Sequence, residues 1–161
     1  MKIMNSIKNL LFLFLLGMVF QLGSCGGEDE GNFPINGTVL SMSDIAGHWE
    51  ANSAIFSQVS DQPIIFDLIT EGGSVLLSIQ PNGRFKLTMN IPGEPSNVIN
   101  GQLGFDEDLL VVKDDAFPDD WEYFGIYLDQ LTLYISGPAE FDFDDNGVED
   151  EAIISLAFER V

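Results

Sequence analysis

Residues 74–91 read SVLLSIQPNGRFKLTMNI and predict a β-hairpin. In the second half of this stretch every other side chain is apolar: Phe85, Leu87, Met89 and Ile91. An alternation with period two is typical of a strand that buries one face. Between the two halves, Pro81-Asn82-Gly83 forms the expected turn, because Asn and Gly accept the positive φ that a tight hairpin requires.

Strand-like patterns continue on both sides of this hairpin. Further strands are predicted at 49–56, 64–69, 97–105, 109–112, 121–128, 131–135 and 152–158. A single helical turn is expected at 41–47, with Ser43 available as its N-cap. Eight to nine short strands joined by turns predict an all-β barrel or sandwich, and consecutive hairpins favour an antiparallel up-and-down order.

Composition narrows the range of functions. The chain has 161 residues, with 26 acidic and six basic side chains and a formal net charge of −20. This charge argues against nucleic acid as a partner, because phosphate binding needs clustered Lys and Arg. A single Cys excludes an intramolecular disulfide, and a single His leaves little for a catalytic triad. Acidic groups at 106–108, 114–115 and 119–122 fall in predicted turns, where solvated charge is expected, so we predict no enzyme.

The first thirty residues have the layout of a secretory signal. Lys2 and Lys8 flank a polar start, and residues 10–20 form an apolar run. That run is shorter than the roughly 20 apolar residues of a transmembrane helix. The segment Leu22-Gly23-Ser24-Cys25 resembles the lipobox of bacterial lipoproteins, in which cleavage before the Cys leaves it to be acylated. The alternative is a free Cys at the edge of an ordinary signal peptide.

The lipobox resemblance implies a domain organisation and a location. Residues 1–24 would be a signal peptide, 25–40 an acylated Cys with a flexible tether, and 41–161 the folded domain. Cys25 would then anchor the protein in outer-membrane lipid, facing the cell surface or the periplasm. The acidic residues at 28–30 resemble the surface-export signal of Bacteroidetes-type lipoproteins, and a solvated acidic linker is the alternative.

A short motif near the start of the domain and one residue near its end carry a further family resemblance, besides that of the lipobox. Gly47-His48-Trp49 begins the first predicted strand, and Arg160 ends the last. This pair resembles the lipocalin superfamily, and is similar in particular to the small lipocalin-like lipoproteins of Bacteroidetes. The resemblance implies an up-and-down barrel of about eight strands in which Gly47, Trp49 and Arg160 close the barrel, the guanidinium covering the indole. The alternative is that Trp49 is an ordinary core aromatic.

The lipocalin resemblance also bears on function. It implies that a monomeric, membrane-anchored protein binds a small apolar or amphipathic ligand. An eight-stranded barrel is only just wide enough to hold one small ligand or to be filled by its own side chains. The alternative is therefore a filled barrel that contacts protein or glycan through its acidic loops.

The segment 142–150, DFDDNGVED, fits the front of a calcium-binding loop. Oxygen ligands would come from five residues: Asp142, Asp144, Asn146, Val148 through its carbonyl, and Asp150. The twelfth position is Ile153 and not the bidentate Glu of an EF-hand, so calcium would bind weakly. The alternative is an acidic hairpin whose turn is 145–147.

Overall fold

The computed structural model describes residues 33–144 and 146–161, so the predicted signal peptide and Cys25 lie outside the described residues. One short helix, α2 (Met42–Ile45), comes before the strands of the described part. The strands are β1 (Gly47–Gln58), β2 (Ile65–Asp67), β3 (Ser74–Ile79), β4 (Arg84–Asn90), β5 (Asn97–Asp106), β6 (Leu109–Asp114), β7 (Glu122–Asp129), β8 (Thr132–Phe141) and β9 (Asp150–Arg160).

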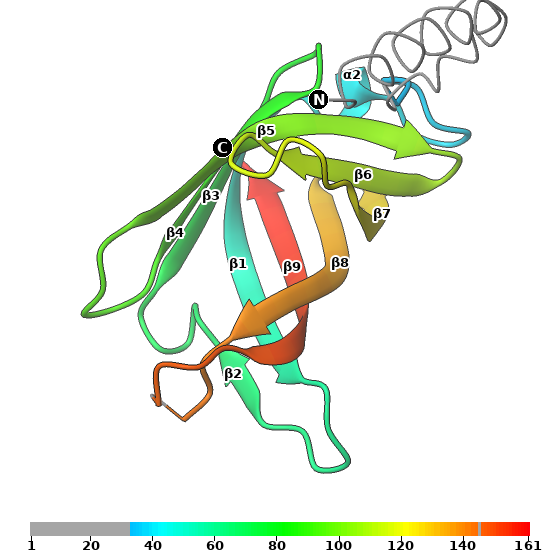
Figure 1. Cartoon of the computed structure of the whole chain (residues 1–161). Helices are drawn as coiled ribbons and strands as arrows, with labels where there is room; N and C mark the ends of the chain where they lie inside the picture. Colours follow the sequence, from blue (N-terminus) through cyan, green and yellow to red (C-terminus); the bar gives the residue numbers. More distant parts are fainter. Residues whose placement is uncertain (1–32, 145) are drawn as a thin grey trace, which may run out of the picture. The chain divides into compact units, whose positions relative to one another are not determined.

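The strands form a closed antiparallel barrel with one extra strand (Figure 1). From β3 to β9 each strand pairs with the next one along the chain, and β3 pairs with the start of β1. β9 returns to pair with β1 from Arg160 opposite Trp49 to Ala152 opposite Gln58, which closes the sheet. β2 is the extra strand and pairs with the far end of β1. The predicted all-β, up-and-down, lipocalin-like barrel is confirmed.

The predicted elements are present, although their bounds differ; for example, the strand predicted at 64–69 is shortened to β2 (Ile65–Asp67). Two of the differences have a clear physical reason. The N-cap of α2 is Ser41 and not Ser43, and both the amide and the hydroxyl of Ser41 donate to the Asp44 carboxylate. β8 runs six residues further than predicted, to Phe141, because it continues to pair with β9 through Gly137 and Pro138. Its pairing with β7 ends at Ser136, so the proline, which lacks an amide hydrogen, lies where β8 needs a single partner strand.

The barrel is tightly packed at the end where α2 lies. Trp49 is 1% exposed and Phe158 is 0% exposed, and both are surrounded by equally buried side chains: Val75, Phe105, Leu110 and Leu133. A water-sized gap beside these groups would leave part of their surface accessible, so this end is filled. Other side chains that pack against this core are only half-buried: Leu87, Met89, Ile99, Phe124 and Phe141.

The part of the predicted tether that the structure describes, residues 33–40, is packed against the barrel. The Pro34 carbonyl accepts a hydrogen bond from the Phe105 amide at 2.8 Å, and the Thr38 amide donates to the Glu107 carbonyl at 3.1 Å. The Phe33 side chain lies against Gly104, where a Cβ atom would come within 2.6 Å of the Cβ of Phe33. The compact unit spans Phe33–Val161 and so includes these residues.

Candidate functional site

The first and last strands meet the helix at the filled end of the barrel. The Arg160 guanidinium carbon lies 4.5 Å from the centre of the Trp49 ring. Arg160 Nη2 donates a hydrogen bond to the Asp44 carbonyl at 2.9 Å, and Trp49 Nε1 donates one to the Ile45 carbonyl at 2.8 Å. The last carbonyls of a helix have no partner within the helix, so these two side chains satisfy them. The contact expected between Trp49 and Arg160 is present.

Gly47 occupies a position that other residues would strain. Its φ is +144°, which side chains with a Cβ rarely adopt. A Cβ atom there would also lie 3.4 Å from Arg160 Nη1. The three residues Gly47, Trp49 and Arg160 therefore join α2 to β1 and β9, whereas His48 is exposed.

A small pocket opens beside this filled end, and we call it the side pocket. Its volume is about 220 Å³. Five of its lining side chains are apolar: Val39, Leu40, Phe105, Ile126 and Leu128. Three are polar: Glu107, Asp108 and Tyr127. Engineered apolar cavities of about 150 Å³ bind benzene, so the side pocket has room for one ring or a short chain.

Unequal strand lengths explain where the side pocket lies. β6 pairs with β7 only as far as Gly125, opposite Leu109. The next inward-facing side chains of β7, Ile126 and Leu128, therefore extend past the start of β6 and stay half-buried. Val39 and Leu40, from the packed N-terminal segment, complete the lining together with Phe105.

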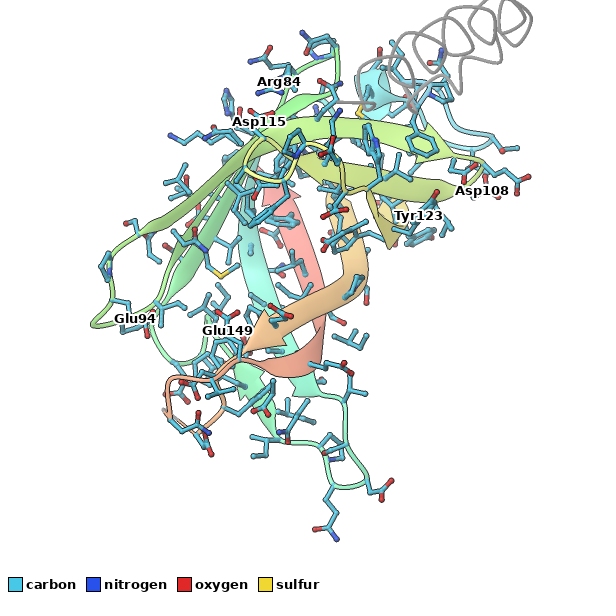
Figure 2. All side chains as sticks on the ribbon, in the orientation of Figure 1. Arg84, Glu94, Asp108, Asp115, Tyr123 and Glu149 are labelled. Atoms are coloured by element: carbon cyan, nitrogen blue, oxygen red, sulfur yellow. The ribbon has the colours of Figure 1, made fainter. Side chains whose placement is uncertain are left out.

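The acidic edge of the side pocket is a two-residue turn. Asp106 pairs with Leu109, which leaves Glu107 and Asp108 as the turn residues between β5 and β6. Glu107 has a φ of 54°, uncommon for a residue with a side chain, and its carbonyl accepts the Thr38 amide. Both carboxylates are exposed, and Figure 2 shows Asp108 at this turn.

Tyr127 has an aromatic neighbour on the outside of the barrel. Its ring stacks on that of Tyr134 from β8, with 6.0 Å between ring centres. The two side chains are 62% and 43% exposed. An exposed aromatic pair of this kind is common at binding surfaces.

In the acidic segment 142–150, hydrogen bonds join the described residues on the two sides of position 145. The Asp142 carboxylate accepts hydrogen bonds from the amides of Gly147, at 2.7 Å, and Asn146, at 3.1 Å. The Gly147 amide is the main cause that holds the pKa of Asp142 below its usual range. Asn146 Oδ1 accepts the Val148 amide at 2.7 Å. Several oxygens proposed as calcium ligands thus already stabilise the turn.

The remaining calcium candidates, Asp144 and Asp150, lie at either side of this turn. Asp144 Oδ1 accepts the Asn146 amide at 3.3 Å, and Asp150 begins β9. Among residues 33–144 and 146–161, no three His, Cys, Asp or Glu side chains form a group that could hold a metal ion. Calcium binding stays a prediction.

Another acidic group is held by an ion pair. Arg84, at the start of β4, donates two hydrogen bonds to Asp115 in the loop after β6, one of them at 2.8 Å (Figure 2). These hydrogen bonds lower the pKa of Asp115. The pair is exposed, and its evident role is to join two turns of the barrel wall.

The side pocket was not predicted from the sequence. Its lining comes from the N-terminal segment, β5 and β7, which are far apart along the chain. The acidic turn at 106–108 was visible as a cluster of carboxylates, but no local pattern connects it with Leu40 or Ile126. The sequence alone does not indicate that these distant segments lie side by side, and the side pocket depends on that contact.

No known family model matches the chain, and no curated protein matches it. The fold nevertheless defines the class of the described part as an all-β, lipocalin-like barrel. Within that part, no helix is both long enough and apolar enough to cross a membrane.

Proposed function

We propose that the chain is an outer-membrane lipoprotein, anchored through acylated Cys25, whose barrel binds a small apolar or amphipathic ligand without catalysis. The lipobox at 22–25 supports the anchor. The compact unit begins at Phe33, eight positions after Cys25 (33 − 25), so the barrel would be held close to the lipid surface.

The anchor is tested by replacing its thiol. In cells fed labelled palmitate, we expect the wild-type protein to carry label and to sediment with membranes. Cys25→Ser should lose the label and leave the membrane fraction, whereas Ser24→Ala, a matched change beside it, should retain both. A labelled, membrane-bound Cys25→Ser protein would contradict the anchor.

The side pocket is the observation that carries the ligand proposal. Five apolar side chains line this open pocket, and burying an apolar group there removes it from water at about 25 cal/mol per Å². Typical ligand pockets measure roughly 300–1,000 Å³, so a pocket of about 220 Å³ suits a small molecule or one end of a longer one.

Binding is tested with 2-phenylethanol, which has a ring of suitable size and no charge. Ligand-observed NMR should detect binding to the wild-type protein and its loss in Leu40→Trp, which fills the side pocket. Leu76→Trp is the matched control, because Leu76 is on the outside of β3 and is already 43% exposed. Binding that survives Leu40→Trp would place the ligand elsewhere.

A second candidate function is an interaction module, favoured by the exposed stack of Tyr127 and Tyr134. Such a surface suits a protein or glycan partner. Tyr134→Ser distinguishes the two candidates, because Tyr134 does not line the side pocket. Loss of glycan capture on an array, with phenylethanol binding unchanged, would support the interaction module.

A further inference from the structure

The charged groups that line the side pocket all have the same sign. Its eight lining residues include two carboxylates, Glu107 and Asp108, and among the described residues no Lys or Arg belongs to the lining. Both carboxylates are exposed at the edge of the pocket, whereas its lining is otherwise apolar apart from Tyr127. A ligand that enters therefore meets negative charge first and apolar surface beyond it.

The outer surface next to the side pocket strengthens this negative field. Asp129 follows Tyr127 by two positions on the same face of β7 and pairs with Thr132. Across the sheet, Thr132 pairs with Glu159, and Glu159 with Glu50. We call the three carboxylates Asp129, Glu159 and Glu50 the acidic row. Like charges directly opposite each other on a sheet, as in Glu159 and Glu50, are destabilising, so the acidic row attracts any cation that approaches it.

Arg160, which follows Glu159 on β9, is already engaged. Arg160 covers the Trp49 ring and donates to the Asp44 carbonyl. Its guanidinium is thus directed to the helix and the indole, and it is not part of the pocket lining.

Tyr127 adds a third contribution at the edge of the side pocket. Its ring is 62% exposed and stacks on Tyr134, and Tyr127 lines the side pocket together with the two carboxylates. Aromatic faces attract ammonium groups through the ring quadrupole, and they do so without attracting carboxylates.

We infer that the side pocket selects small organic ammonium ions, in which a positive charge adjoins one ring or a short alkyl chain. The apolar part would fill the space between Leu40, Phe105 and Ile126, and the ammonium would lie near Glu107, Asp108 and Tyr127. This inference rests on the proposed function, and it names the ligand class of the same site.

The expected selectivity is moderate because the carboxylates are solvated. Exposed ion pairs are weak, so two of them should favour an ammonium over an uncharged analogue by about three- to tenfold. A carboxylate analogue should bind more weakly than the uncharged one. Both preferences should shrink in 1 M salt, where charges beyond about 3 Å are screened.

Three ligands that share a ring and a short chain test the inference: 2-phenylethylammonium, 2-phenylethanol and 3-phenylpropanoate. We would measure their affinities by calorimetry with the anchored protein in zwitterionic lipid nanodiscs, subtracting empty nanodiscs. The order ammonium, alcohol, carboxylate is expected. In Glu107→Gln with Asp108→Asn, the ratio of ammonium to alcohol affinity should fall to about one. Asp119→Asn with Asp120→Asn removes the same charge from the loop between β6 and β7 and should keep the ratio.

The outcomes separate the inference from the proposed function. Equal affinities for the ammonium and the alcohol, or a ratio that survives the double change at the turn, would overturn the inference and leave the apolar site standing. Failure of all three ligands to bind would overturn both. If the double variant does not fold, Asp108→Asn alone should reduce the logarithm of the ammonium-to-alcohol affinity ratio to about half of its wild-type value.

Discussion

Replacing Arg160 with Ala tests how the barrel is closed. Two interactions disappear: the guanidinium 4.5 Å from the Trp49 ring centre and its 2.9 Å hydrogen bond to the Asp44 carbonyl. A cation over an aromatic ring at an exposed site contributes about 0.5–1 kcal/mol. A hydrogen bond from a charged donor contributes about 1.5 kcal/mol at the low end of its range, which suits an exposed side chain. We therefore expect a loss of about 2 kcal/mol.

Urea unfolding of a fragment that spans 26–161, followed by Trp fluorescence, measures this loss. The midpoint should fall with no change in the slope m, because the surface exposed on unfolding stays the same. In a thermal melt the same loss corresponds to about 5–10 °C. Arg160→Lys should recover part of the stability, since an ammonium keeps the charge and lacks the planar fork.

Arg84→Ala is the matched control, because it removes another arginine at the surface, the one that pairs with Asp115. Exposed ion pairs contribute about 0–1 kcal/mol, so the midpoint should fall by less than it does for Arg160→Ala. A midpoint for Arg160→Ala that is no lower than that for Arg84→Ala would refute the reasoning, and closure would then depend on the β1–β9 ladder alone.

Three further predictions concern charge. Glu50→Gln removes one of two carboxylates that face each other across β1 and β9, and should stabilise the fold by about 0.3 kcal/mol at low salt, with no gain in 1 M salt. A hydrogen bond from the Thr70 hydroxyl is the main cause that lowers the pKa of Asp67 below 3.8. The stability that Asp67 contributes is therefore present above about pH 4 and lost as the pH falls through the folded pKa, so Asp67→Asn should flatten urea midpoints between pH 5 and 2. Calcium bound by the 142–150 loop, with a dissociation constant on the order of 10⁻⁴–10⁻³ M, should raise the melting midpoint where magnesium does not, and an unchanged midpoint would leave the loop an acidic hairpin.

The strands and their order could be predicted because their signals are local. In the hairpin at 74–91, the period of the apolar residues depends only on neighbours along the chain, and Asn82-Gly83 specifies the turn. The resemblance to the lipocalin superfamily implied that Gly47, Trp49 and Arg160 act together, and the structure brings the first and last strands side by side at these residues.

Tertiary structure alone decided where the side pocket lies and which charges border it. The composition of residues 33–40 suggests a spacer, yet Phe33 packs on Gly104 and Thr38 bonds to Glu107. The free energy that fixes this segment comes from β5, about seventy residues further along, and no local pattern contains it. The side pocket depends on that docking, since Leu40 completes a lining that the early end of β6 leaves open.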